Sequence, residues 1–266
     1  MRMISELIDL RGRTALITGA TGGIGKKIAF TIAELGGDLI FVDRPGSNYD
    51  QLKKSINHFA VNIECIDCDL ESEASRINLF DRFVSNNDNL DILINNAAFV
   101  GESNLEGWTD DFSKQSIETW NRALAVNLTA PFHLSQLFYS LLKQSSNGSI
   151  INIASIYGIN APDYSLYKDT SMGNPAAYSA SKGGLIQLTR WLATTVSPEI
   201  RVNSISLGGI WRNQPSIFVK RYCSKTPLGR MGHEEDIQGA IAYLASELSL
   251  YVTGENIVID GGWTIK

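Results

Sequence analysis

The chain has 266 residues, of which 44% are hydrophobic and 19% charged, a composition typical of a globular protein with a substantial core. Its net charge of −5 argues against a surface for nucleic acids or anionic membranes. Glu6 and Asp9 interrupt the apolar start of the chain, which makes it a poor secretory signal. No run approaches the roughly eighteen apolar residues of a membrane span, so we expect a cytoplasmic protein.

Short β-rich runs alternate with longer helical patterns along the whole chain. We predict strands at 14–18, 38–43, 61–67, 90–95, 149–155, 201–207 and 256–260. Helices are expected at 23–35, 49–59, 73–85, 116–143, 176–196, 215–224 and 234–248. Several strands are nearly continuous apolar runs, which is typical of a parallel sheet covered by helices on both faces. No linker divides the chain, so we predict one α/β domain over residues 1–266, a Rossmann-like doubly wound parallel sheet of about seven strands.

A glycine-rich turn, Thr18-Gly-Ala-Thr-Gly-Gly-Ile-Gly25, joins the first strand to the first helix. Such a turn lets the backbone approach a pyrophosphate, and the helix behind it offers free N–H groups and the positive end of a dipole. A tight turn without a ligand would carry the same glycines. Asp43 ends the second strand, where a carboxylate accepts hydrogen bonds from ribose hydroxyls and repels a 2′-phosphate. The sequence therefore favours NAD over NADP, although Arg44 beside it could attract that phosphate.

Cys65 and Cys68 form a C-x-x-C pair, a spacing that occurs in zinc and redox sites. They fall in a segment that reads as a strand, where residues three apart point to opposite faces. No second pair exists, and the three histidines are scattered without ligand spacing. We interpret the cysteines as structural, in a reducing compartment, and predict no metal site.

Tyr178 and Lys182 lie four residues apart in a predicted helix that follows Pro175. Positions i and i+4 share one helix face, so the ammonium group is expected beside the phenol. A nearby positive charge favours the phenolate and lowers the pKa of a tyrosine, which makes Tyr178 a candidate general acid/base for an alcohol or carbonyl. The spacing alone also occurs on solvated helix faces, so the rest of the chain must decide.

These motifs together resemble a short-chain dehydrogenase/reductase of the classical type, from Thr14 to Gly262. The matching segments are the turn 18–25, Asp69-Leu70, Asn95-Asn-Ala-Ala98, Ala125-Val-Asn-Leu128, Ile153-Ala-Ser155 and Tyr178-x-x-x-Lys182. Asp69-Leu70 resembles the pair that contacts adenine, and Ala98 replaces the final glycine of the family's Asn-Asn-Ala-Gly element. The resemblance implies an NAD(P)-dependent oxidoreductase that acts on the CH–OH group of a small-molecule substrate.

The resemblance also implies roles for individual residues. Tyr178 would be the acid/base, and Lys182 would lower its pKa and hold the nicotinamide ribose. Ser155 would stabilise charge on the substrate oxygen, and Asn127 would hold a water in a proton relay. The residues expected to bind the cofactor are Gly19, Thr21, Gly22, Gly23, Ile24, Gly25, Asp43, Arg44, Asp69, Leu70, Asn96, Ala97, Ala98, Tyr178, Lys182 and Ile210.

The chain departs from the family pattern in two places. Leu207 replaces the usual proline after the sixth strand, and Arg212 stands where a threonine would contact the nicotinamide amide. The backbone of Ile210 would still serve that amide. The second departure is an extra segment at 159–175, between the catalytic serine and tyrosine. We expect it to form a loop over the substrate end of the pocket, although a plain surface insertion has the same composition.

The segment 159–175 is rich in hydroxyls, amides and carboxylates, which suit a polyhydroxylated ligand better than a steroid or an acyl chain. A second candidate lid, 211–221, adds Arg212, Lys220 and Arg221, which could meet a phosphate or simply be solvated. The insertion and the Asn213-Gln-Pro215 element are similar to a gluconate dehydrogenase-like subgroup associated with bacterial surface-polysaccharide and flagellin-glycan pathways. We therefore expect oxidoreduction of a sugar, sugar acid or sugar phosphate.

Two other functions stay open. A 3-oxoacyl-carrier-protein reductase belongs to the same family, but such enzymes usually use NADPH, which Asp43 disfavours. A non-catalytic NAD-binding scaffold would have no need of an activated phenol. The resemblance also implies a homotetramer or homodimer, with the helices at 116–143 and 176–196 in the interface.

Overall fold

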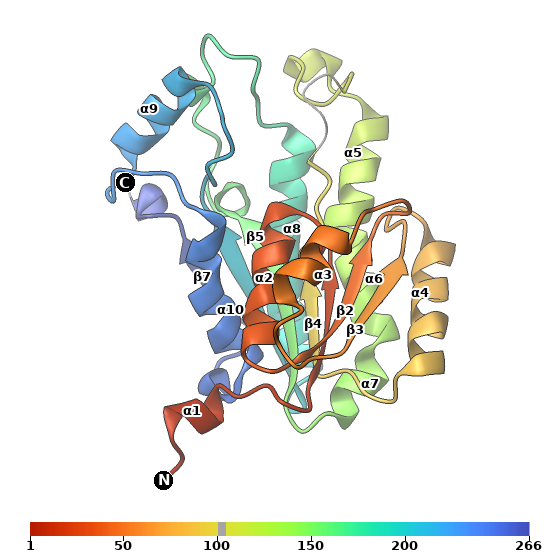
Figure 1. Ribbon diagram of the computed structural model, residues 1–266. Coiled ribbons are helices and arrows are strands. Elements are labelled where there is room, and N and C mark those ends of the chain that lie inside the picture. The colour runs from red at the N-terminus through yellow and green to blue at the C-terminus, as the bar shows by residue number, and fades with distance from the viewer. Residues whose placement is uncertain (101–104, 266) are drawn as a thin grey trace.

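A twisted seven-stranded parallel sheet forms the centre of the computed structural model, which describes residues 1–100 and 105–265 (Figure 1). The strands are β1 (Thr14–Thr18), β2 (Asp38–Asp43), β3 (Ile63–Asp67), β4 (Ile92–Asn95), β5 (Gly148–Ser155), β6 (Ile200–Leu207) and β7 (Asn256–Ile259). Their order in the sheet is β3-β2-β1-β4-β5-β6-β7. All seven predicted strands are confirmed, and the order reverses direction between β1 and β4, where ligands of doubly wound sheets bind.

Helices cover both faces of the sheet because successive strand residues point to opposite sides. One face packs against α2 (Gly23–Glu34), α3 (Asp50–Ile56) and α10 (Gln238–Ala245). The other packs against α4 (Glu73–Asn86), α6 (Ala130–Leu137), α7 (Tyr139–Gln144) and α8 (Ala176–Thr195). Ile17 of β1 faces the first layer and Leu16 the second, and both are fully buried.

The helix expected at 116–143 is present, but it is interrupted twice. It consists of α5 (Ile117–Leu124), a π-helical turn (Ala125–Thr129), α6 and α7. Pro131 has no N–H, so it cannot donate the usual helical hydrogen bond to the carbonyl four residues earlier. That carbonyl belongs to Asn127, a predicted catalytic residue. The π turn therefore occurs where the sequence removes a donor, as π turns at functional sites often do.

The other predicted helices are present, with different ends. The helix expected at 215–224 is α9 (Ser216–Lys225), and a short α1 (Ile4–Leu7) was not predicted. The helix expected at 234–248 begins with a 3-10 turn (Glu234–Ile237) and ends with another (Glu247–Ser249) around α10. No described helix is both long and apolar enough to cross a bilayer.

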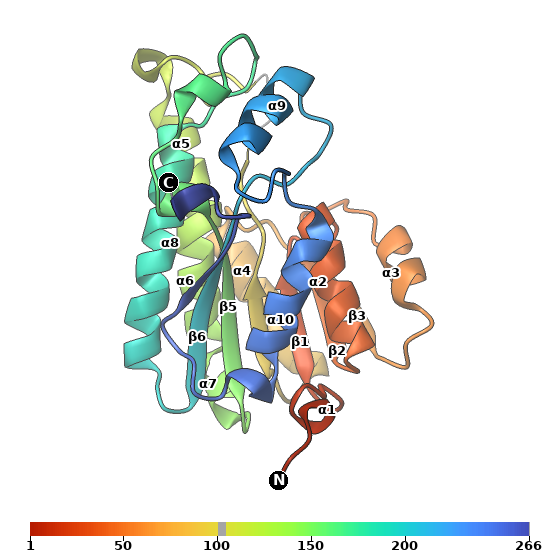
Figure 2. The same ribbon diagram turned by 90° about the vertical axis from the view of Figure 1, so that its left-hand side faces the viewer.

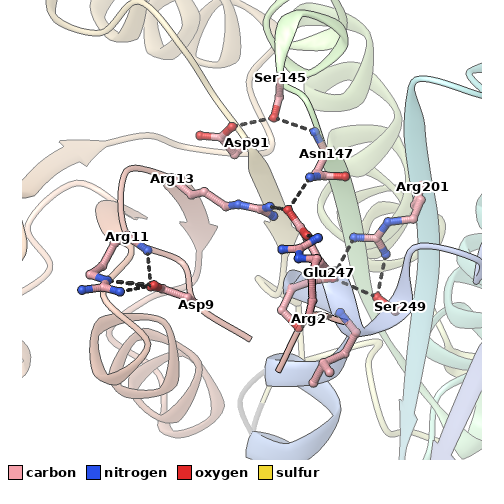
Figure 3. A network of polar contacts seen from close by, with 12 residues as sticks. Arg2, Asp9, Arg11, Arg13, Asp91, Ser145, Asn147, Arg201, Glu247 and Ser249 are labelled. Atoms are coloured by element: carbon pink, nitrogen blue, oxygen red, sulfur yellow. Dashed lines mark hydrogen bonds and ion pairs between the residues drawn. The ribbon is translucent and has the colours of Figure 1, made fainter. Parts of the chain in front are cut away.

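A polar network joins three loops at the amino ends of the strands, opposite the expected site (Figure 3). Glu247 accepts hydrogen bonds from Arg13 and Asn147, each at 2.8 Å, and pairs with Arg2. Arg201, at the start of β6, donates to the Ser249 hydroxyl at 2.8 Å. Burial and the charge of Arg13 lower the pKa of Arg201 to about 10. The network fixes this end of the sheet and contains no element of the expected site.

Candidate active site

A cavity of about 960 Å³ opens at the carboxyl ends of β1, β2, β4, β5 and β6. Its wall contains every residue expected to bind the cofactor except Gly25, together with three of the four expected catalytic residues, Ser155, Tyr178 and Lys182. Asn127 lies outside the wall. The structure thus brings together residues that are up to about 190 positions apart in the sequence.

Two glycines of the turn are required by close packing of its backbone against neighbouring protein atoms. Gly19 has a φ of +64°, and a Cβ there would lie 2.8 Å from the Cα of Ala97. A Cβ on Gly25 would lie 2.1 Å from the Gly19 oxygen, so this glycine lets α2 pack against the turn rather than lining the cavity. The Asn96 amide braces the turn by donating to the carbonyls of Thr18 and Gly19 at 2.9 and 3.0 Å. No residue with a side chain fits at Gly19 or Gly25 without moving this backbone.

Asp43 is held in place at the edge of the same cavity. One carboxylate oxygen accepts from the backbone N–H of Thr21 at 2.8 Å and from its hydroxyl at 2.7 Å. The other accepts from the backbone N–H of Arg44 at 2.9 Å. A fixed carboxylate at the end of β2 fits ribose hydroxyls and opposes a 2′-phosphate. The turn and Asp43 together fit the adenosine and pyrophosphate of a dinucleotide.

Lys182 is one helical turn beyond Tyr178 on α8, and its side chain is almost completely buried, with 2% exposed. Its Nζ lies 5.9 Å from the centroid of the Tyr178 ring and donates to the Ile153 carbonyl at 2.7 Å. Burial lowers the pKa of Lys182 to about 8. The predicted juxtaposition of ammonium and phenol is confirmed, with the ammonium anchored to β5.

The direction of the Tyr178 pKa differs from the prediction. Burial raises this pKa, and a hydrogen bond with Ser155 and the charge of Arg212 oppose the rise. The removal of water from the phenol therefore outweighs the local charges. The role of Lys182 in stabilising the phenolate stays a prediction. Arg212, expected only as a departure from the family pattern, also influences the phenol.

Ser155 and Asn127 are held by different hydrogen bonds. Ser155 ends β5, and its hydroxyl accepts the backbone N–H of Tyr157 at 3.2 Å. The Asn127 side chain accepts the N–H of Phe99 at 2.6 Å and donates to the Ser181 hydroxyl at 3.0 Å. These bonds commit its amide to holding the π turn against α8. Its backbone carbonyl, for which Pro131 offers no N–H, is the group that suits the expected water.

The comparisons with known proteins agree with this geometry. A family model described as enoyl-(acyl carrier protein) reductase matches residues 19–264. A 3-oxoacyl-[acyl-carrier-protein] reductase of Rickettsia felis is 35% identical, over 96% of this chain and 98% of that protein. The chain is a short-chain dehydrogenase/reductase.

Two solved structures of similar proteins extend the comparison. A short-chain dehydrogenase of Leptospira borgpetersenii with bound NAD⁺ has 34% identity and a TM-score of 0.83, over 99% of this chain and 96% of that one. A 2-deoxy-D-gluconate 3-dehydrogenase of Agrobacterium tumefaciens, so named provisionally, with bound NADP has 29% identity and a TM-score of 0.83, over 98% and 99%. Similar dehydrogenases thus bind either nicotinamide dinucleotide.

A chamber of about 170 Å³ adjoins Ser155 and Tyr178 in this short-chain dehydrogenase/reductase. Its aromatic and methionine lining consists of Tyr157, Tyr167, Met172, Phe218, Tyr222 and Met231. The only side-chain amide in the lining is that of Gln214, and no charged side chain of the described residues lines the chamber. Tyr167, Met172 and Phe218 lie in the two segments expected as lids. The other three were not predicted, because they lie outside those segments.

The extra segment 159–175 is not a plain surface insertion. It supplies Tyr167 and Met172 to the chamber, and the hydroxyls of Tyr167 and Tyr157 lie 2.5 Å apart. Figure 2 shows the segment beside α9 above the sheet, and Lys225 of α9 pairs with Asp163 across this contact. Arg221 also binds the segment, through Asp169 at 3.3 Å, so this base is not free for a phosphate as the sequence allowed. The two candidate lids form one cap.

The two cysteines of the C-x-x-C pair belong to the core rather than to the site. Cys65 is half-buried on β3 and Cys68 is buried just beyond it, and burial raises the pKa of both thiols. Within residues 1–100 and 105–265, no three His, Cys, Asp or Glu side chains gather as metal ligands. Cys68 does line the cavity, but as a protonated apolar contact at neutral pH.

Proposed function

We propose that this short-chain dehydrogenase/reductase is an NAD(H)-dependent enzyme that interconverts a secondary alcohol and a ketone on a small ring, such as that of a sugar, sugar acid or sugar phosphate. The observation that carries the proposal is the chamber that adjoins both the Ser155 hydroxyl and the Tyr178 phenol. A substrate carbon held there lies next to both groups and within reach of the larger cavity.

The larger cavity would hold the dinucleotide. The turn 18–25 would take its pyrophosphate, Asp43 its adenosine ribose, and Lys182 its nicotinamide ribose. When bound, the nicotinamide supplies the hydride chemistry, which no side chain can provide. NAD is preferred to NADP because the Asp43 carboxylate is fixed by Thr21 and would repel a 2′-phosphate. Because a similar structure contains NADP, the preference is to be tested by comparing the affinities for NADH and NADPH.

The side chains of the site handle the proton. Tyr178 would donate its phenolic proton to the substrate oxygen during reduction and accept it back during oxidation. Ser155 would donate a hydrogen bond to the same oxygen as charge develops there. The Lys182 ammonium, held by the Ile153 carbonyl at 2.7 Å, would stabilise the phenolate that reduction leaves behind. A water on the Asn127 carbonyl would connect this ammonium to solvent.

The size of the chamber favours a small cyclic substrate. A protein cavity of about 150 Å³ accepts one benzene-sized ring, so a chamber of about 170 Å³ suits a single ring. Tyrosine hydroxyls and Gln214 offer hydrogen bonds to ring hydroxyls, and the aromatic faces suit ring C–H groups. Any charge on a sugar acid or phosphate would have to lie outside the chamber, toward Arg212.

The second candidate function is reduction of a 3-oxoacyl group on a carrier protein, which the name of the Rickettsia felis relative favours. The fixed Asp43 and the aromatic end of the chamber count against it. A steady-state screen with NADH and NADPH against polyols, sugar acids, small cyclic ketones and a 3-oxoacyl thioester separates the two. Turnover confined to the thioester with NADPH would reject the sugar proposal.

Replacement of the phenol tests whether the chain is an enzyme at all. We expect Tyr178→Phe to reduce turnover at least about a hundredfold, because general acid/base catalysis contributes roughly that much or more. The affinity for NADH, measured by fluorescence titration, should change less than about threefold. An unchanged turnover would reject the mechanism. Failure of the wild-type protein to turn over any of the substrates, with NADH binding intact, would favour the scaffold function.

A further inference from the structure

An ion pair that no family motif contains lies over the first turn of α2. Arg212 Nε is 3.2 Å from Glu234 Oε1. A Cβ built on Gly23, the first residue of α2, would lie 2.6 Å from that carboxylate oxygen and 3.1 Å from Arg212 Nη2. The pair therefore touches the glycine turn itself, at the place where the N-terminus of a twelve-residue helix presents its free N–H groups.

The charges at this place would allow Arg212 to exchange one anionic partner for another. The cavity wall contains four basic residues within the described part of the chain, and Arg212 is the one that lies against Gly23. Lys182 is anchored to the Ile153 carbonyl, and Arg122 pairs with Glu71 at 2.9 Å. The turn 19–25 has no basic residue of its own. The helix dipole and the guanidinium both favour an anion at this place, and Glu234 supplies it.

The backbone around Arg212 is fixed while its side chain is accessible. Its N–H donates to the Gln214 side chain at 2.7 Å, and Gln214 donates back to the Ile210 carbonyl at 2.8 Å. The Arg212 side chain is 53% exposed, against 27% for Glu234. A long side chain on a fixed loop, half in solvent, can change partner without any movement of the fold.

We propose that Arg212 binds the pyrophosphate of the dinucleotide, and that its guanidinium exchanges the Glu234 carboxylate for the phosphate oxygens. Glu234 is then the internal competitor that keeps dinucleotide affinity moderate. The inference rests on the proposed cofactor site, and it explains why an arginine is useful where the family pattern has threonine. A planar guanidinium can donate two parallel hydrogen bonds to a phosphate, which a threonine cannot do.

Binding of fragments without turnover tests the exchange. Isothermal titration with ADP-ribose, which carries the pyrophosphate, and with adenosine, which does not, would be compared for wild type, Arg212→Met and Glu234→Gln. Loss of a charge-assisted hydrogen bond should weaken ADP-ribose binding about tenfold or more in Arg212→Met, with adenosine within about twofold. Glu234→Gln should tighten ADP-ribose binding severalfold.

Lys27→Met is the matched control, because Lys27 of α2 pairs with Glu235 at 2.7 Å, beside the proposed pair but outside the cavity wall. It should leave both affinities unchanged, and thermal unfolding of each variant verifies the fold. Unchanged ADP-ribose affinity in Arg212→Met would overturn the inference. The same result with a raised KM for an anionic substrate would assign Arg212 to the substrate instead. Absence of ADP-ribose binding by the wild type would reject the cofactor site itself.

Discussion

Lys182 gives the clearest pH dependence at the scale of single residues. Burial lowers its pKa in the folded protein to about 8, against 10.5 for an exposed lysine. Between these values the unfolded chain holds the proton and the folded chain does not, so a rise in pH favours folding. We expect the free energy of unfolding of the wild type, relative to Lys182→Met, to increase by about 1 kcal/mol from pH 7 to pH 9. Urea unfolding at pH 7, 8 and 9 measures it.

Lys143 provides the control for this comparison. It is an exposed lysine whose pKa is raised by a hydrogen bond with Glu199, so Lys143→Met should not reproduce the drift. A constant difference in the free energy of unfolding between wild type and Lys182→Met from pH 7 to pH 9 would show that burial does not lower the pKa of Lys182. At pH values well above 8 the proposed enzyme should also lose activity as this charge disappears.

The sequence predicted correctly those site residues that belong to short motifs. Ser155, Tyr178 and Lys182 meet in one cavity wall as expected, because strand ends and an i, i+4 spacing fix their positions. Two ion pairs were not predicted, because no sequence pattern connects their members. Arg212 and Glu234 are 22 positions apart, and Arg122 and Glu71 are 51 positions apart. The direction of the Tyr178 pKa was also missed, because burial is a property of the fold.

At the scale of elements, the carboxylate of Glu247 holds the loop between α10 and β7 in place. Glu247 is 15% exposed and counters Arg13, which is 13% exposed, as well as Arg2 (Figure 3). Removal of one partner from a buried pair leaves the other charge without compensation. We expect Glu247→Gln to lower the free energy of unfolding by about 3 kcal/mol, measured by guanidinium chloride unfolding.

Glu199→Gln is the matched control, because its pair with Lys143 is exposed at 37% and 47% and should contribute little. If Glu247→Gln unfolded at the same denaturant concentration as the wild type, the network would be a surface feature without a role in stability. NADH affinity should survive in Glu247→Gln under native conditions, since the network lies at the opposite end of the sheet from the cavity.

Hydrophobic periodicity predicted the strands correctly but did not predict the interruptions of one helix. Apolar runs placed all seven strands within two residues of their observed starts and ends, because strands covered on both faces have few polar residues to confuse the pattern. The two interruptions of the helix expected at 116–143 were not predicted. Pro131 was the visible signal, since a proline one turn after Asn127 removes that helix's regular hydrogen bond.

Four of the exposed large apolar side chains lie on, or just before, three helices of one layer of the molecule. Phe112 precedes α5, Ile117 begins it, Phe132 lies on α6 and Trp191 on α8, and all four are exposed. Figure 2 shows these helices together along one edge, away from α2, α3 and α10. A patch of large apolar side chains on a folded protein marks an interaction surface. We propose that this face pairs with the same face of a second copy, as the predicted homotetramer or homodimer requires.

A single charge on that face tests the assembly. Trp191 is 53% exposed on α8, and Trp191→Glu would place a carboxylate from each copy in the proposed interface. We expect the mass measured by light scattering to fall to half of the wild-type value or less, because buried like charges oppose association. Ile4→Glu, on the exposed α1 at the other end of the molecule, should leave the mass unchanged. A Trp191→Glu protein that kept the wild-type mass would place the interface elsewhere. Since Tyr178 and Lys182 lie on the same helix α8, loss of pairing should also lower the thermal stability of the site.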